Sequence, residues 1–409
     1  MNYTPVEVRA VPLDLAKVAL QIGSMVTRLK AGSQERQEHL WCALETLHNN
    51  ADEIDYLKQK IAHSQTTWLL ADPVNRLDCH YAVPPLPAEF TVIATDGSHI
   101  DVDRHKSTRC YLINIGTTIL HYGDQPDAIL DSFPSLYSGD ENLVMAPTVG
   151  KGREQLIEGT LLGIKRGVEE CYQLAKLAAD LPPNSLTLAL LDGSLILWGL
   201  EGYPEFVTEI LLKQGFLGYL EDMRRWNKDR RLALNSYISF PRSTDVVNAL
   251  RVAICPHNPP NCDHFCPPGS ERGCDKIAGI QDQELYLNLL TEGERSAIFI
   301  SRSSILRKHY GTHRIYFFYL RVADEIARIE VPEWVAIDKS LLDLVHTLVV
   351  DQCQRGQGYP VALSEAHEQA VVTGTDKEYF WQLVESSLID ERLPSLSSAK
   401  SSSKRTRWV

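Results

Sequence analysis

The chain has 409 residues, of which 44% are hydrophobic, and its formal net charge is -12. This length and hydrophobic content suffice for one large domain with appendages or for two ordinary domains, so we expect a globular protein. The acidic balance argues against a general polyanion-binding surface, although a local basic channel beside an acidic site is compatible with it. No signal-peptide pattern and no long apolar run stand out, so we expect a cytoplasmic protein without membrane contact.

The N-terminal region, residues 1–80, is predicted to be helical. Apolar residues recur at spacings of three and four through residues 12–70, which is the period of an amphipathic helix. We expect a helical arm or hairpin that serves packing or a dimer contact and carries no chemistry. Pro84, Pro85 and Pro87 then break the chain, and the main domain is predicted over residues 81–385.

Two strands of the main domain are predicted to end in the same tripeptide. A β-rich run over 90–95 leads into Asp96-Gly-Ser, and a buried run over 186–191 leads into Asp192-Gly-Ser. Between them we expect a hairpin over 110–122 that turns at Gly116, and a helix over 152–180. Antiparallel pairing of the first strands is the natural expectation.

The remaining pattern completes an α/β fold and ends in a polar tail. Strands are predicted over 232–238, 296–301, 315–322 and 327–331, and helices over 204–231, 281–291, 338–355 and 359–372. The Ser-rich, basic stretch within residues 386–409 is predicted to be disordered.

Asp96 and Asp192 form the first candidate site. A single Asp-Gly is most often an ordinary turn, but two copies that each close a buried strand are harder to attribute to turns alone. If the two strands are neighbours, the carboxylates approach closely and repel each other unless a cation lies between them. Hard oxygen ligands favour Mg²⁺ or Mn²⁺ over Zn²⁺, which predicts divalent-metal chemistry on phosphate.

A third acid is expected from the helix between the two aspartates. We choose Glu170, because Arg166 lies four residues earlier and the buried side of the helix lies nearby. Glu158 is the reserve, and Glu154 and Glu169 stay open as alternatives; each would otherwise be an ordinary solvated residue. Late in the chain, Tyr359 and His367 fall on roughly the same helical face. A neutral imidazole there could ligate a metal or shuttle a proton.

Basic and cysteine residues supply two further hypotheses. Arg302, Arg307, Lys308 and Arg321 are candidate phosphate contacts, although such residues are more often simply solvated. In the insertion at about 255–275, four cysteines gather without a Cys-x-x-Cys pair. Two interpretations stay open for it, a structural Zn²⁺ site or a Pro-rich surface insertion with free thiols. The four cysteines are Cys255, Cys262, Cys266 and Cys274.

The order of several segments resembles the NurA nuclease family. The similarity spans about residues 90–385, and its force lies in the succession of segments, since no single motif would suffice. The segments are Asp96-Gly-Ser, Asp192-Gly-Ser-Leu, Ser236-Tyr-Ile-Ser with Val246-Val-Asn-Ala-Leu-Arg251, Gly293-Glu-Arg-Ser-Ala-Ile-Phe, Phe317-Phe-Tyr-Leu-Arg, Ala327-Arg-Ile-Glu-Val-Pro and Gly358-Tyr-Pro-Val-Ala-Leu-Ser-Glu-Ala-His.

The resemblance implies an RNase H-like mixed sheet flanked by helices and a manganese-dependent nuclease that digests DNA 5′ to 3′, with single-strand endonuclease activity left open. It also implies a homodimer that docks onto a hexameric HerA-type ATPase in DNA-end processing and repair. Carried over by position, Asp96, Asp192 and His367 match the family's metal-site residues. Tyr359 matches a tyrosine of the closing motif, and Glu170 is the least secure match.

Two other functions remain as alternatives. The first is a catalytically silent subunit that keeps the fold and scaffolds an ATPase or DNA, for which the helical arm and basic tail would be suited. The second is a small-phosphoester hydrolase with the same metal chemistry. The chain has no Gly-rich phosphate cradle and no Asp-x-Asp motif at the end of the first strand, which argues against the second.

Overall fold

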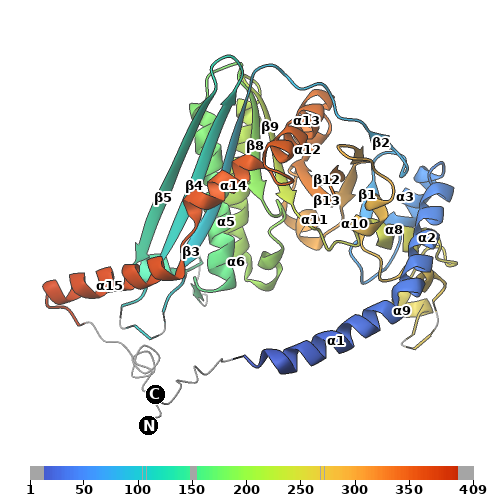
Figure 1. Cartoon of the computed structure of the whole chain (residues 1–409), viewed down its shortest axis with the longest axis horizontal. Coiled ribbons are helices and arrows are strands. Elements are labelled where there is room, and N and C mark those ends of the chain that lie inside the picture. Colours follow the sequence, from blue (N-terminus) through green and yellow to red (C-terminus); the bar gives the residue numbers. More distant parts are fainter. Residues whose placement is uncertain are drawn as a thin grey trace, which may run out of the picture.

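The computed structural model describes residues 13–394, apart from 104, 107, 148–153, 268 and 271. Most strands belong to one large mixed sheet (Figure 1). The strands of this sheet are β1 (Ala71–Pro73), β2 (His80–Tyr81), β3 (Phe90–Ile100), β4 (Cys110–Tyr122), β5 (Asp127–Ser138), β8 (Leu186–Asp192), β9 (Arg231–Ile238), β10 (Arg295–Ser296), β11 (Phe299–Ser301), β12 (Ile315–Val322) and β13 (Glu325–Pro332). A separate ladder joins β6 (Val144–Met145) to β7 (Gln155–Leu156).

The order along the sheet is β1-β11-β12-β13-β9-β8-β3-β4-β5, with β2 and β10 paired beside it. Strands β3, β4 and β5 are antiparallel neighbours, as expected, whereas β8 runs parallel to both β3 and β9. Parallel neighbours need a crossover, and helix α5 (Thr160–Asp180) supplies the one between β5 and β8. This half of the sheet has the RNase H-like arrangement that the family resemblance implied.

Helices cover both faces of this half. Helix α5 packs on one face, while α13 (Lys339–Arg355) and α14 (Val361–Ala370) lie on the other. Strand β8 lies between the two layers, and its residues 187–190 are fully buried, as expected for a parallel strand covered on both sides. The other main helices are α6 (Glu205–Thr208), the π-helical segment η2 (Glu209–Phe216), α7 (Leu217–Trp226), α8 (Asp245–Ala253), α10 (Asp282–Leu287), α11 (Ser304–His309) and α12 (Glu333–Ala336).

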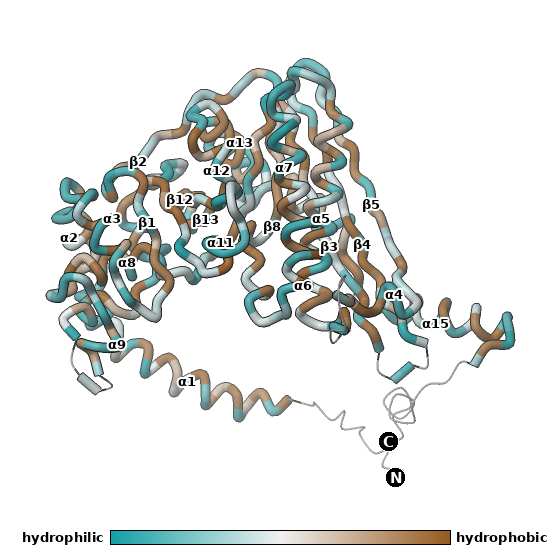
Figure 2. Tube along the Cα trace, turned by 180° about the vertical axis from the view of Figure 1, so that it is seen from behind, coloured by the Kyte–Doolittle hydropathy of each residue, from teal (hydrophilic) through white to brown (hydrophobic). Residues whose placement is uncertain are grey.

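Three helices occupy the N-terminal segment that was predicted to be helical. Helices α2 (Ser33–Asn49) and α3 (Ile54–Ala62) pack against α8, whereas α1 (Leu15–Ala31) has no buried residue. Figure 2 shows α1 reaching away from the body with hydrophobic residues along it. Across the described part of the chain, none of the helices combines the length and the apolar character that a membrane crossing requires.

The hairpin predicted within residues 110–122 is wrong. Strand β4 runs unbroken through Gly116, and the turn to β5, a strand that the sequence analysis missed, follows at residues 123–126. Gly116 serves a different purpose. A Cβ atom on it would lie 2.1 Å from the carbonyl oxygen of Ala366 and 2.4 Å from the amide nitrogen of Ala370. The glycine therefore lets the backbone of α14 approach the sheet directly.

Several boundaries also differ from the prediction. Helix α5 begins at Thr160, so Glu154 and Glu158 precede it, and residues 148–153 lie outside the described part. Helices α8 and α11 were missed, as was α15 (Gly374–Asp390). The predicted tail over 386–409 overlaps the end of α15, and its residues 395–409 lie outside the described residues.

The contact at Gly116 leads to a stability prediction. We expect Gly116→Ala to destabilise the chain by roughly 1–3 kcal/mol, because an added methyl group there meets helix backbone that cannot rotate away. Gly163→Ala is the matched control, since Gly163 lies within α5 with nothing inside 4 Å of the added atom. It should be neutral or stabilising by up to about 1 kcal/mol. Urea unfolding measures both, and equal midpoints for the two variants would contradict the close approach.

Candidate active site

Two neighbouring strands place Asp96 and Asp192 next to each other. Thr95 of β3 lies opposite Leu191 of β8 in parallel register, and the two aspartates occupy the next position on each strand. The condition under which the two carboxylates approach closely, that their strands are neighbours, is therefore met. Strand β8 ends at Asp192, and Gly193 has a φ of 82°, which is the turn expected there.

The turn predicted at Asp96-Gly-Ser is wrong, because β3 continues through it to Ile100. Gly97 is needed for space on the α5 face of the sheet. A Cβ atom on Gly97 would lie 2.5 Å from Glu170 Oε1 and 2.9 Å from Arg166 Cγ. The two identical tripeptides therefore use their glycines differently, one for a close contact and the other for a left-handed turn.

Glu170 is the helix acid that the structure brings to the aspartates. Its side chain is 7% exposed, Thr95 donates a hydrogen bond to its carbonyl oxygen at 3.0 Å, and its Oε1 lies 2.9 Å from Arg166 Nε. Burial raises the pKa of Glu170 to about 7; Arg166 opposes this, whereas the charges of Asp96 and Asp192 add to it. The influence of both aspartates on one buried carboxyl means that the three groups form one electrostatic cluster.

The opposite face contributes His367 and Tyr359. His367 of α14 contacts Asp96, with 2.6 Å between Nδ1 and Oδ2, and the Tyr359 hydroxyl donates to Asp192 Oδ1 at 3.2 Å. The Tyr359 ring packs edge-on against Tyr237 with centroids 5.4 Å apart. Burial and the charge of Asp192 raise the pKa of Tyr359, so this hydroxyl keeps its proton and acts as a donor.

Each carboxylate of the cluster has its own local donor. Asp96 has His367, Asp192 has Tyr359 and Glu170 has Arg166. As the side chains stand, no three His, Cys, Asp or Glu groups surround a common point in the described residues. The pKa of Asp192 is nevertheless raised, by burial and by the charge of Asp96. The cluster is thus an array of oxygen donors whose mutual repulsion a cation would relieve.

A buried ionic network that the sequence analysis missed supports the loop after Asp192. Glu330 is 1% exposed, and its Oε2 accepts hydrogen bonds from Ser194 Oγ at 2.8 Å and from the amide of Leu195 at 2.9 Å. Arg328 pairs with Glu330 and with Asp245, each at 3.0 Å. Two charged residues at alternate positions on one face of the apolar strand β13 were the signal that could have found it.

The predicted basic residues have different surroundings. Arg321 donates to the carbonyls of Leu287 and Leu290, so it closes the end of α10. Arg302 pairs with Asp72 at 3.0 Å. Arg307 and Lys308 are exposed and form no ion pair within the described residues.

The zinc interpretation of the cysteine insertion is not supported. Its four cysteines are free thiols and line one cavity of about 20 Å³, and in the described part of the segment they form no group of three or more ligands placed to hold a metal ion. Arg251 lies beside them, with its Nη2 3.8 Å from Cys274 Sγ and its guanidinium 3.6 Å over the Trp68 ring. In the described residues the segment is thus a Pro-rich insertion with free cysteines.

Comparison with known proteins identifies the family. Residues 90–372 match the family model of the NurA domain. The chain belongs to the NurA family. Among solved structures, the NurA nuclease from Sulfolobus solfataricus matches with 13% sequence identity and a TM-score of 0.46, over 84% of this chain and 94% of that one. The search of curated proteins found no match.

Membership of the NurA family supports a nuclease function, and the donor set of this NurA chain fits a hard divalent cation. The cluster offers carboxylate oxygens from three separate elements, β3, β8 and α5, together with the imidazole of His367. Glu170 Oε1 is buried and accepts no hydrogen bond within the described structure, so its only partner there is the Arg166 ion pair. Asp96, Asp192, Glu170 and His367 are the residues that would hold the ion.

The raised pKa of Glu170 generates a test without any activity assay. Between its ordinary value of 4.5 and its folded value of about 7, the folded chain holds a proton that the unfolded chain has released. The stability of the metal-free protein should therefore fall as the pH rises through this range, by roughly 3 kcal/mol. Glu170→Gln cannot ionise, so we expect this variant to lose that dependence and to exceed the wild type in stability at about pH 8.

Urea unfolding in EDTA across this pH range measures the effect. Glu169→Gln is the matched control, because Glu169 pairs with Lys165 and Tyr137 away from the cluster. It should keep the wild-type pH dependence. The same slope for Glu170→Gln and the wild type would contradict a buried, charge-coupled carboxyl.

Proposed function

We propose that this NurA chain is a divalent-metal-dependent DNA nuclease. The observation that carries the proposal is the convergence of Asp96, Asp192 and Glu170, which come from two neighbouring strands and the helix between them. Such a group of carboxylates favours Mn²⁺ or Mg²⁺ and suits hydrolysis of a phosphodiester. Family membership supports a nuclease function, and the family resemblance is the basis for proposing DNA as the substrate class.

The position of each residue in the cluster suggests its role in the proposed reaction. Asp96, Asp192 and Glu170 are the proposed metal ligands, and His367, 61% exposed at its side chain, is the ligand or proton carrier that faces the substrate. Tyr359 holds Asp192 through its hydroxyl, and Arg166 keeps Glu170 against the sheet. The bound ion supplies the chemistry, because it lowers the pKa of an attacking water and offsets charge on the leaving oxygen.

The finer assignments follow from the family resemblance. We propose 5′ to 3′ digestion with manganese as the preferred ion, a homodimer, and action in DNA-end processing with a hexameric HerA-type ATPase. The competing function is a silent scaffold for that ATPase or for DNA. The exposed helix α1, which buries no residue in the single chain, suits a protein contact in either case.

The nuclease proposal is tested with purified chain and end-labelled single-stranded and duplex DNA in Mn²⁺, Mg²⁺ or EDTA. We expect cleavage that EDTA abolishes. Asp192→Asn and Glu170→Gln should each lower the rate by at least about 100-fold, since residues that merely support metal ligands already contribute up to about 100-fold. Glu169→Gln, one residue from Glu170 and outside the cluster, should cleave at nearly the wild-type rate.

Two results would redirect the proposal. Metal-dependent cleavage that survives both Asp192→Asn and Glu170→Gln would show that the reaction occurs at another site. No cleavage by the wild type under any condition, even with the ATPase, would favour the scaffold.

A further inference from the structure

Two adjoining cavities lie beside the loop that follows Asp192. The first has a volume of about 330 Å³ and is lined by the segment 64–70 together with Trp198, Arg302 and Arg307. The second has a volume of about 300 Å³, and its walls include Ser194 and Arg242. Leu69 and Trp198 line both cavities, so the two lie side by side, and together they are called the groove here.

The second cavity lies close along the chain to the proposed cleavage centre. Ser194, which lines it, lies two residues after Asp192, and its Oγ accepts a hydrogen bond from Trp198 Nε1 at 3.2 Å. The same Ser194 is held by Glu330, so the position of Trp198 is fixed through the buried network beneath the loop. The loop that follows Asp192 therefore also forms part of the groove wall.

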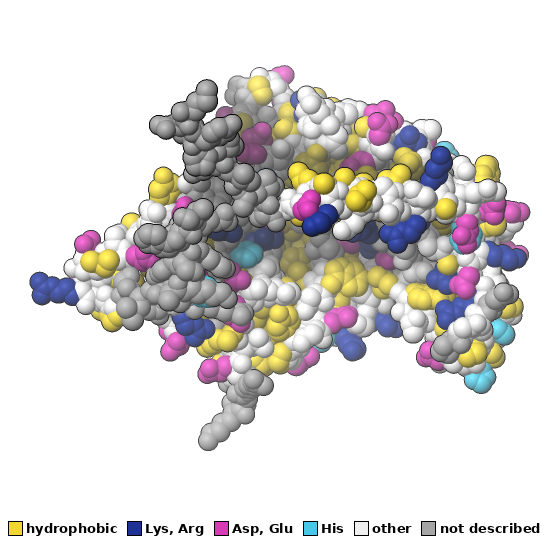
Figure 3. Space-filling model, turned by 60° about the horizontal axis from the view of Figure 1, so that its bottom comes forward, with side chains coloured by type: hydrophobic (Ala, Val, Ile, Leu, Met, Phe, Trp, Pro, Cys, Tyr) yellow, Lys and Arg dark blue, Asp and Glu magenta, His cyan; other side chains and the backbone are white. Residues whose placement is uncertain are grey.

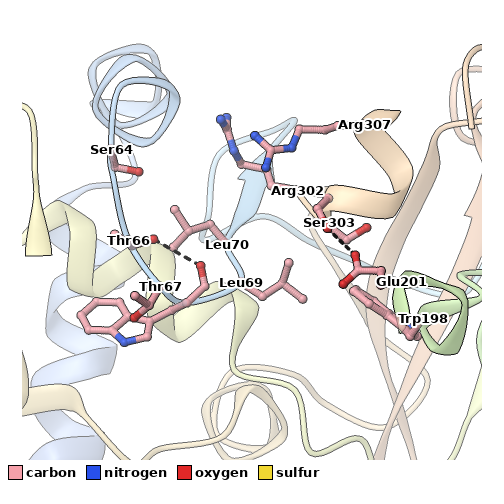
Figure 4. Close-up of a pocket in the computed structure, with 12 residues that line it drawn as sticks. Ser64, Thr66, Thr67, Leu69, Leu70, Trp198, Glu201, Arg302, Ser303 and Arg307 are labelled. Atoms are coloured by element: carbon pink, nitrogen blue, oxygen red, sulfur yellow. Dashed lines mark hydrogen bonds between the residues drawn. The ribbon is translucent and has the colours of Figure 1, made fainter. Parts of the chain in front are cut away.

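The first cavity carries the positive surplus of the groove. Figure 4 shows the guanidinium groups of Arg302 and Arg307 directed into it. Arg302 shares its charge with Asp72, whereas Arg307 is exposed and without an ion pair in the described chain. The acid Glu201 of this cavity is occupied by the hydroxyl of Ser304 and the amide of Ile305. In the second cavity the charges balance, with Arg242 and Arg328 beside Asp245 and Glu330. On the face shown in Figure 3, Lys and Arg side chains lie around a hollow in the surface, with Asp and Glu side chains among them.

The groove also offers one exposed aromatic surface. Trp198 is 39% exposed, and its indole N–H is already bonded, which leaves the ring face for stacking. The aromatic residues of β12, by contrast, are all buried and unavailable to bases. An arginine pair beside an exposed aromatic ring is the combination with which proteins bind single strands without sequence preference.

We propose that this groove binds a single-stranded DNA segment next to the scissile phosphate. Arg302 and Arg307 contact the phosphates, and Trp198 stacks on a base. A free nucleotide would fill only one of the cavities, whereas two cavities side by side suit a chain of nucleotides. This inference rests on the proposed nuclease function for its substrate class, but it is measured by binding and not by cleavage.

The test uses full-length protein and a fluorescein-labelled single-stranded oligonucleotide in EDTA, so that no cleavage occurs, with anisotropy as the readout. We expect Arg307→Gln to weaken binding and to reduce the slope of log K against log salt by about 1. Lys308→Gln is the matched control, because Lys308 is exposed on the same helix but does not line either cavity. It should bind like the wild type.

Trp198 is tested by two substitutions and two ligands. Trp198→Leu should bind the oligonucleotide at least about 5-fold more weakly, the lower end of what base stacking contributes. Trp198→Phe keeps an aromatic face and should retain most of the affinity. An oligonucleotide with abasic positions should bind wild type and Trp198→Leu equally.

The outcomes separate this inference from the nuclease proposal. The proposal that the groove binds DNA would be overturned if Arg307→Gln and Lys308→Gln lost the same amount of affinity for the oligonucleotide. It would also be overturned if Arg307→Gln and Trp198→Leu bound it as tightly as the wild type. Neither result would contradict the nuclease proposal, which is tested by cleavage. Groove-dependent binding by a chain that never cleaves DNA would support the groove and contradict the nuclease.

Discussion

Repulsion among three carboxylates is the constraint on which the rest of the site depends. Asp96 and Asp192 lie side by side on parallel strands, and Glu170 is buried against the same place from helix α5. Burial and like charge together raise the pKa of Glu170 to about 7. Each acid has a separate polar partner: His367 contacts Asp96, Tyr359 donates to Asp192, and Arg166 pairs with Glu170. The surrounding fold keeps these groups together at a cost in stability, as functional sites commonly do.

Two glycines make this convergence sterically possible. Gly97 leaves space for Glu170 on one face of β3, and Gly116 lets α14 bring His367 to the other. Beyond the end of β8, buried Glu330 holds the loop that follows Asp192 by accepting hydrogen bonds from it. Close backbone packing and a fully bonded buried ion network therefore hold the acids in place, so that an ion would find its ligands already near one another.

Local patterns in the sequence were sufficient for several of the long strands, for the two aspartates at neighbouring strands and for the choice of a helix acid that lies beside them. Alternating and continuous apolar runs predicted β3, β8, β9 and β12, and the spacing to Arg166 selected the helix acid that the structure places in the cluster. Helical spacing singled out Tyr359 and His367, and the family resemblance then matched them to the site. Neither residue could be placed against an aspartate from periodicity, because the two contacts join residues that lie 167 and 271 positions apart in the chain.

The failures at the two glycines share one physical origin. Gly116 and Gly97 look like turn residues along the chain, but their role is set by α14 and α5, which pack on them from distant parts of the sequence. Such tertiary contacts cannot be read from the residues next to each glycine. Strand β5 was missed for a different reason, because it is exposed along nearly its whole length and so lacks the apolar alternation of a buried strand.

The claim that Asp96, Asp192 and Glu170 hold a divalent ion is tested most directly by anomalous diffraction from crystals of the chain grown with Mn²⁺. We expect at least one strong anomalous peak within bonding distance of both Asp96 and Asp192, with the Glu170 side chain released from Arg166 and turned towards it. Full occupancy of manganese elsewhere, with Asp96 still on His367, Asp192 still on Tyr359 and no peak between the two aspartates, would contradict it.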